Sequence, residues 1–98
     1  MKQPEDCESI EDVRRAIDAL DREVISLIDR RARYVEAAAS FKTGERSVRA
    51  PERQQAMLAD RRLWAEEAGL DPDVIEEIYR TLVSYFVDRE MQHWRDVT

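Results

Sequence analysis

Apolar residues in the N-terminal half of the chain recur at alternating spacings of three and four positions. This heptad pattern predicts a helix that buries one narrow face against another helix. Ser9 and Asp12 form a variant capping box that marks its start, and no Gly or Pro follows until Gly44. Such a helix is about 50 Å long, so we expect a partner along its whole length. The face comprises Ile10, Val13, Ile17, Leu20, Val24, Leu27, Tyr34, Ala38 and Phe41.

Turn signals divide the remainder into a loop and two shorter helices. The polar segment 43–50 breaks the periodicity and predicts the loop. Pro51 suits the first turn of a second helix, and Gly69 suits the position after its end. Asp71 followed by Pro72 predicts the start of a third helix. We therefore predict an all-α chain of three helices in a single domain, residues 1–98. The faces expected to be buried are Met57, Leu58, Trp64, Ala65 and Ala68 in the second helix, and Val74, Ile75, Ile78, Tyr79, Leu82, Val83, Phe86, Val87 and Trp94 in the third.

Composition and charge narrow the classes of partner. A chain of 98 residues builds only a small core of its own, which favours association with a second copy. The net charge of −6 argues against a nucleic-acid partner or an anionic membrane surface. The chain has a single cysteine, Cys7, no apolar run typical of a signal peptide, and no apolar stretch of the ~20 residues that a membrane span needs. His93 stands alone, so we expect no metal site. These observations predict a cytoplasmic protein.

Two cations in the long helix lie where apolar residues are expected. Arg31 occupies the seam position between Leu27 and Tyr34. Because an unpaired buried charge costs several kcal/mol, Arg31 either forms a buried ion pair or binds an anionic ligand. Lys42 lies on the same face about 16 Å further along, so the two head groups could hold the ends of a small dianion. Alternatively, Lys42 is a solvated residue favoured by the helix dipole.

Arg14 and Glu90 are the other two polar candidates. Arg14 lies about 42 Å from Lys42, so the two can meet on one ligand only if a second long helix runs antiparallel to the first. Otherwise Arg14 forms a surface pair with Asp18. Glu90 lies within the apolar face of the third helix, where a carboxyl group is either paired with an arginine or kept neutral by burial. Perturbed acids of this kind are candidates for a functional site.

Short segments along nearly the whole chain carry a specific resemblance. They are the opening Met-Lys-Gln-Pro-Glu-Asp-Cys, Val13-Arg14 with Ile17-Asp18, Arg30-Arg31, Tyr34-Val35, Phe41-Lys42, Ala50-Pro51-Glu52-Arg53, Met57-Leu58, Trp64-Ala65-Glu66-Glu67, Gly69-Leu70-Asp71 and Trp94-Arg95. In these segments the chain resembles the isochorismate pyruvate-lyases of salicylate and siderophore biosynthesis. Those enzymes belong to the all-helical chorismate mutase family.

The resemblance implies an intertwined homodimer with two identical sites, each built from both chains. It implies that Arg14 of one chain and Arg31 of the other bind the carboxylates of a small dicarboxylate substrate. Lys42 and Glu90 would face the breaking ether oxygen, and Arg53 would lie over the site. The reaction would be a pericyclic elimination of pyruvate that leaves salicylate and needs no cofactor or metal. The segment expected to act as a lid is Thr43, Gly44, Glu45, Arg46, Ser47 and Val48.

Two departures from the family pattern keep alternatives open. Position 90 is Glu, where the characterised lyase has Gln and some mutases have Glu, which favours a dedicated chorismate mutase or a mutase of a chorismate analogue. Positions 50 and 54, where bacterial mutases commonly carry acids that bind a substrate hydroxyl, are Ala and Gln, which favours the lyase. Gln54 can still accept a hydrogen bond from the substrate. A third hypothesis is a non-catalytic dimerisation module, against which the cation at position 31 argues.

Overall fold

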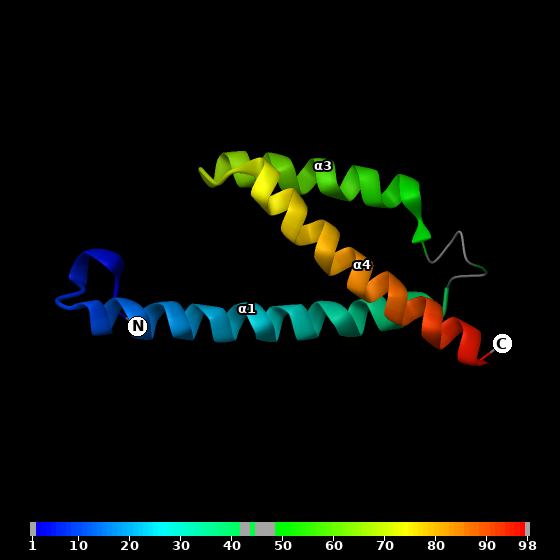
Figure 1. Cartoon of the computed structure of the whole chain (residues 1–98), viewed down its shortest axis with the longest axis horizontal. Helices are drawn as coiled ribbons and strands as arrows, with labels where there is room; N and C mark the ends of the chain where they lie inside the picture. The colour runs from blue at the N-terminus through cyan, green and yellow to red at the C-terminus, as the bar shows by residue number, and fades with distance from the viewer. Residues whose placement is uncertain (1, 42–43, 45–48, 98) are drawn as a thin grey trace. The chain divides into compact units, whose positions relative to one another are not determined.

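The described part of the chain is helical throughout. The computed structural model describes residues 2–41, 44 and 49–97, except for the side chains of Trp94 and Val97. Within these ranges lie a short 3-10 helix, η1 (Pro4–Asp6), and three α-helices, α1 (Ile10–Ala39), α3 (Pro51–Glu67) and α4 (Pro72–Val97), and no strand (Figure 1). The predicted all-α class with three helices is confirmed. The chain divides into two compact units, Met1–Tyr34 and Val35–Thr98.

The first unit contains η1 and most of α1. The predicted capping box is present in modified form. The Ser9 hydroxyl accepts a hydrogen bond from the Asp12 amide at 3.2 Å, as expected. The Asp12 carboxylate, however, accepts from the amide of Glu8 at 3.0 Å rather than from that of Ser9. The cap thus extends one residue further back and ties the segment before α1 to its first turn.

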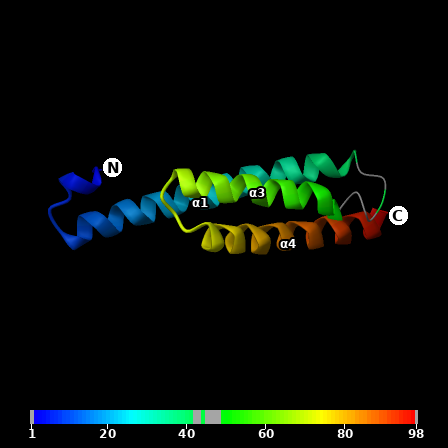
Figure 2. The same ribbon diagram turned by 90° about the horizontal axis from the view of Figure 1, so that it is seen from above.

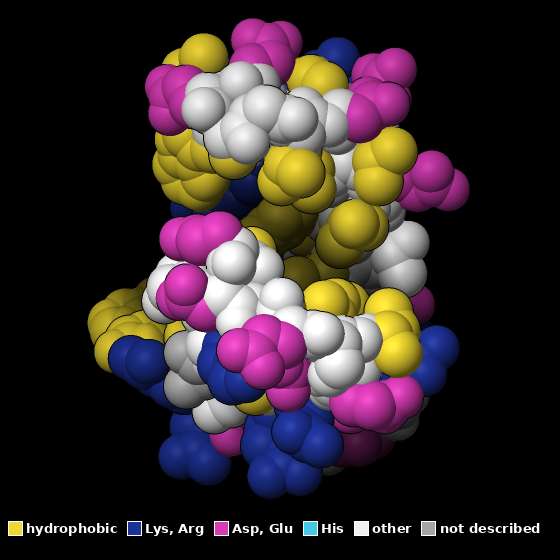
Figure 3. All heavy atoms as spheres, turned by 90° about the vertical axis from the view of Figure 1, so that its left-hand side faces the viewer, with side chains coloured by type: hydrophobic (Ala, Val, Ile, Leu, Met, Phe, Trp, Pro, Cys, Tyr) yellow, Lys and Arg dark blue, Asp and Glu magenta, His cyan; other side chains and the backbone are white. Residues whose placement is uncertain are grey.

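The apolar face of α1 is open to water in the single chain. Its 30 residues span about 45 Å, and Ala32 is its only buried residue. The predicted seam residues Ile17, Leu20, Val24 and Leu27 are 50%, 47%, 51% and 56% exposed. Solvent-facing apolar side chains are visible in the space-filling view (Figure 3). A contiguous apolar strip of this length is typical of a surface that binds another protein.

The end of α1 comes earlier than the apolar pattern predicts. The helix ends at Ala39, so Phe41, assigned to its seam, lies beyond it and is 86% exposed. The cause is local. The Ser40 hydroxyl donates to the Ala37 carbonyl at 2.9 Å, and the amide of Phe41 donates to the Ala38 carbonyl at 3.0 Å. These bonds to the third residue back tighten the chain out of α-helical geometry.

In the second unit, α3 and α4 run in opposite directions from a tight connection (Figures 1 and 2). As predicted, α3 begins at Pro51, and Gly69 follows its end with a φ of 76°. The amides of Gly69 and Leu70 donate to the carbonyls of Glu66 and Ala65 at 3.1 and 2.8 Å, which is the Schellman arrangement. Asp71 then caps α4 by accepting from the Asp73 amide at 2.9 Å. Each boundary of this turn is therefore set by local hydrogen bonds.

The core of the second unit is small. Among the described residues, the buried side chains of α3 are Met57, Leu58 and Ala65, and those of α4 are Phe86, Glu90 and Met91. Several residues expected to be buried are not, because Trp64, Val74 and Ile78 are 51%, 51% and 53% exposed and Ala68 is also exposed. One hairpin cannot cover the apolar faces of both its helices. The predicted burial of these four positions is therefore not met by the helices of the single chain.

Four charged side chains interact at the end of the hairpin where α3 is connected to α4. Arg62 of α3 contacts Asp73 and Glu76 of α4 through Nη1, at 2.9 and 3.2 Å. Arg80 contacts the other oxygen of Glu76 at 2.9 Å. Hydrogen bonds first from Arg80 and then from Arg62 hold the pKa of Glu76 below its ordinary value. The contact with Asp73 raises the pKa of Arg62.

Candidate functional site

The predicted site residues are distributed over both units. Arg14 and Arg31 lie on α1 in the first unit, whereas Arg53, Gln54 and Glu90 lie on α3 and α4 in the second. Arg31 is the seventeenth residue after Arg14, which corresponds to about 26 Å along one helix, so these two residues of one chain do not share a small ligand. Lys42 and the lid residues Thr43, Glu45, Arg46, Ser47 and Val48 lie outside the described residues.

Glu90 is the one polar residue with a buried side chain among those described, at 7% exposed. Its neighbours along the helix, Phe86 and Met91, are 5% and 3% exposed. The prediction that position 90 belongs to the buried face of α4 is confirmed. A carboxyl group held in such surroundings is well suited to a polar contact with a ligand that excludes water.

Arg31 is half-buried, and its Nη1 atom is shielded from solvent. The next residue, Ala32, is 8% exposed. The expectation that this guanidinium is partly withdrawn from water is therefore confirmed. Such a cation interacts more strongly with a carboxylate than a solvated one does, because the surrounding medium screens the charge less.

Arg14 has an exposed side chain, with 66% of its surface accessible. Its Nη1 lies 3.4 Å from the Glu11 carboxylate, one turn earlier in α1. The alternative that paired Arg14 with Asp18 is wrong in its partner. Because a long contact between two exposed side chains is weak, the pair with Glu11 would give way readily to a bound carboxylate.

The start of α3 contains a feature that the sequence did not reveal. Ala50, the residue before α3, has φ 40° and ψ 60°, the left-handed conformation. The side-chain amide nitrogen of Gln54 donates to the Arg49 carbonyl. The backbone amide of Gln54 donates to the Ala50 carbonyl at 3.0 Å. Arg53 lies in the first turn of α3, directly before Gln54, and its side chain is exposed. Pro51 indicates the opposite, since a residue before proline ordinarily adopts an extended conformation.

A second unforeseen contact joins the last turns of α1 to α4 within the second unit. Arg89 Nη2 lies 3.5 Å from the Glu36 carboxylate. The guanidinium carbon of Arg89 is 5.5 and 5.8 Å from the ring centres of Tyr85 and Phe86. This cation is directly adjacent to Glu90 in the sequence of α4. No local pattern in the sequence indicates a pair between residues so far apart.

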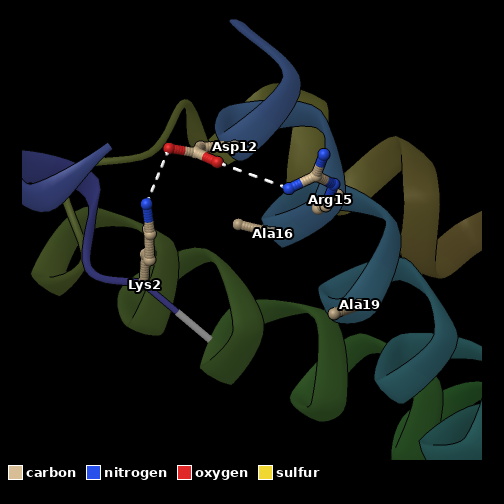
Figure 4. Close-up of a pocket in the computed structure, with 5 residues that line it drawn as sticks. All are labelled: Lys2, Asp12, Arg15, Ala16 and Ala19. Atoms are coloured by element: carbon tan, nitrogen blue, oxygen red, sulfur yellow. Dashed lines mark hydrogen bonds and ion pairs between the residues drawn. The ribbon is translucent and has the colours of Figure 1, made fainter. Parts of the chain in front are cut away.

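A cavity of about 310 Å³ lies elsewhere, between the N-terminal segment and the first turns of α1. It is lined by Lys2, Asp12, Arg15, Ala16 and Ala19 (Figure 4). Asp12 lies between the two cations, 2.9 Å from Lys2 and 3.5 Å from Arg15. The hydrogen bond that Asp12 accepts from the Glu8 amide, and then the one from Lys2, lower the pKa of Asp12. Its carboxylate is therefore ionised and forms ion pairs with both Lys2 and Arg15. None of the predicted site residues lines this cavity.

The described side chains can be compared with what metal binding and anion binding each require. Residues 2–41, 44 and 49–97 contain no group of three or more His, Cys, Asp or Glu placed to hold a metal ion. None of the helices in these ranges is both long and apolar enough to cross a membrane. What the described part offers is a set of guanidinium groups and one buried carboxyl. Such groups hold a dianionic substrate and stabilise charge that develops on it.

Comparisons with known proteins agree with this interpretation of the side chains. Residues 13–91 match the family described as chorismate mutase type II. The chain is 41% identical over 95 residues to the isochorismate pyruvate lyase of Pseudomonas aeruginosa, covering 97% of this chain and 94% of that protein. It is 43% identical over 74 residues to the T-protein of Haemophilus influenzae and 33% identical over 72 residues to that of Enterobacter agglomerans, but spans only 20% and 19% of those two proteins. The chain therefore belongs to the chorismate mutase type II family.

Proposed function

We propose that this protein is an isochorismate pyruvate-lyase with weak chorismate mutase activity. The observation that carries the proposal is the match to the Pseudomonas aeruginosa lyase at 41% identity, which extends over 97% of this chain and 94% of that protein. A similarity of that extent includes both ends of the chain, where Arg14 and Glu90 lie. The half-buried Arg31 and the buried Glu90 supply the cation and the polar group that such a reaction needs.

In the proposed reaction the ether bond of isochorismate breaks while a hydrogen atom passes from the ring to the methylene carbon of the enolpyruvyl group. The ring becomes aromatic salicylate, the side chain leaves as pyruvate, and no external reactant is consumed. Arg14 and Arg31 bind the two carboxylates, and Arg53 covers the ligand. Lys42 stabilises the charge that grows on the ether oxygen, which Glu90 also faces. The protein's task is to hold the folded conformer, with no cofactor.

We further propose that the working unit is a cytoplasmic homodimer with sites shared between chains. Two observations support the dimer. The seam of α1 is about half exposed at Ile17, Leu20, Val24 and Leu27, and a second copy would cover it. Arg14 and Arg31 lie too far apart along one helix to bind one ligand, so an antiparallel pair of long helices would bring Arg14 of one chain to Arg31 of the other. The single cysteine supports a reducing compartment.

The test is to incubate the purified protein separately with isochorismate and with chorismate and to identify the products. Pyruvate and salicylate formed faster from isochorismate than prephenate is formed from chorismate would support the lyase. The reverse ratio would identify a dedicated chorismate mutase, the second candidate. Turnover of neither substrate would leave the non-catalytic dimerisation module as the better account.

A dedicated chorismate mutase remains the second candidate because of one residue, Glu90. Glu90 is buried at 7% exposure, and some mutases of the family carry Glu at this place, whereas the characterised lyase carries Gln. The residues at positions 50 and 54 oppose this candidate, since Ala50 provides no side-chain acceptor and Gln54 provides no carboxylate for a substrate hydroxyl. The product ratio decides between them.

A further inference from the structure

The junction before α3 holds a backbone conformation that its residue type disfavours. Ala50 is the one residue other than glycine with a positive φ in the described ranges. For an L-residue with a Cβ atom the left-handed region is strained, because Cβ approaches the neighbouring carbonyl oxygen. A residue before proline ordinarily adopts an extended conformation. Something other than the intrinsic preference of alanine therefore keeps Ala50 in place.

Gln54 makes two hydrogen bonds to this junction. Its side-chain nitrogen donates to the Arg49 carbonyl, and its backbone amide donates to the Ala50 carbonyl at 3.0 Å. Gln54 thus binds the carbonyl groups of both residues that precede Pro51. If the side-chain bond were lost, Ala50 could relax toward the extended region. The first turn of α3, which carries Arg53, would then start in another direction.

We propose that Gln54 is a positioning residue, whose side-chain amide clamps the Arg49 carbonyl, holds Ala50 in the left-handed conformation and so orients Arg53 toward the substrate. This inference rests on the proposed function for the role of Arg53, but not for the clamp itself. It differs from the expectation that Gln54 binds the substrate directly. In the clamp the essential group is the nitrogen, a donor, whereas a substrate hydroxyl would be bound by the oxygen, an acceptor.

Replacing Gln54 by Glu separates the two roles. Glutamate has the same shape and keeps an acceptor, but when ionised it cannot donate to the Arg49 carbonyl and repels it. With isochorismate as the substrate, we expect Gln54→Glu to lower kcat/KM for pyruvate release by about fivefold to tenfold, mainly through a higher KM. The matched control is Gln55→Glu, the same change at the next, exposed position. It should leave kcat/KM within about twofold of the wild-type value, as expected of a surface substitution.

A rescue experiment tests the role of Ala50. Glycine adopts positive φ without strain, so a chain that carries Ala50→Gly depends less on the clamp. The Ala50→Gly/Gln54→Glu double variant should therefore return to within about twofold of the Ala50→Gly single variant. A Gln54→Glu protein that keeps wild-type lyase activity, or that gains chorismate turnover, would overturn the proposal in favour of direct substrate binding. Additive losses in the double variant would overturn it as well.

Limited digestion with trypsin tests the clamp without reference to activity. Cleavage after Arg49, followed by mass spectrometry, reports how often the junction opens. We expect cleavage at this bond to be several-fold faster in Gln54→Glu than in Gln55→Glu, and an equal rate in both would contradict the clamp. If the wild-type protein turns over neither isochorismate nor chorismate, the proposed function fails, and the digestion result still decides whether the clamp exists.

Discussion

The two compact units of this chain differ in how much of their apolar surface is buried within the single chain. In the second unit α3 and α4 pack against each other, bury Met57, Leu58 and Phe86, and are tied at one end by Arg62 and its two acids. In the first unit the seam of α1 stays about half exposed. Capping and salt bridges stabilise both, but only the hairpin finds its apolar partner within its own chain. The exposed seam of α1 is the surface that the proposed second copy would cover.

The largest expected effect comes from placing a charge on the seam of α1. Leu20→Glu should abolish the dimer and most of the fold, because burial of each such leucine contributes ~1.5–3 kcal/mol and the substitution occurs in both chains. Sedimentation velocity and circular dichroism measure the result. Arg22→Glu, a change at an exposed position outside the seam, is the control and should remain dimeric. A folded, active monomer of the wild-type protein would refute the dimer.

Next in size is the loss of the half-buried cation of the first unit. We expect Arg31→Ala to lower kcat/KM by at least about tenfold, because charge-assisted hydrogen bonds to a carboxylate contribute ~1.5–3 kcal/mol each. Arg33→Ala, which removes an exposed guanidinium 3.1 Å from Asp29, should change it far less. Steady-state kinetics on isochorismate with both variants test this. Equal losses would mean that the site is misplaced.

A smaller and different effect is expected at Glu90 in the second unit. Glu90→Gln replaces the carboxyl group by an amide of similar shape that always carries a donor, so it should retain or raise kcat/KM for isochorismate. Asp88→Asn, on an exposed part of the same helix, should leave kcat/KM unchanged. Steady-state kinetics on both variants test this, and an inactive Glu90→Gln enzyme would show that the carboxylate acts as an anion.

The smallest effect concerns the charged tie of the hairpin. The neighbouring Arg80 and Arg62 lower the pKa of Glu76, so its ionised form is favoured more in the folded state than in the unfolded one. Its contribution to stability is therefore complete well above the ordinary value of 4.5 and is lost as the pH falls through the lowered folded-state pKa. Urea titrations should show that Glu76→Gln differs from wild type at neutral pH and that this difference shrinks in acid. Glu77→Gln, at an exposed position, should show no comparable trend.

The sequence predicted most where the cause is local. Pro51, Gly69 and the pair Asp71-Pro72 each mark a helix boundary that the structure confirms, because caps and stops depend on residues within one turn. The end of α1 was missed for a related reason. Heptad periodicity extends to Phe41, but the hydroxyl of Ser40 competes locally for a backbone carbonyl and ends the helix first.

The helical class, the positions of the turns and the places of Arg31 and Glu90 on apolar faces could be predicted from the sequence, since each follows from spacing along the chain. The structure was needed to show that Trp64, Val74 and Ile78 are exposed in the single chain, that Arg89 reaches Glu36, and that Gln54 bonds the Arg49 carbonyl beside a left-handed Ala50. These features depend on which surfaces one chain can cover and on contacts between separate elements. A periodic pattern shows that a side chain needs covering, but not what covers it.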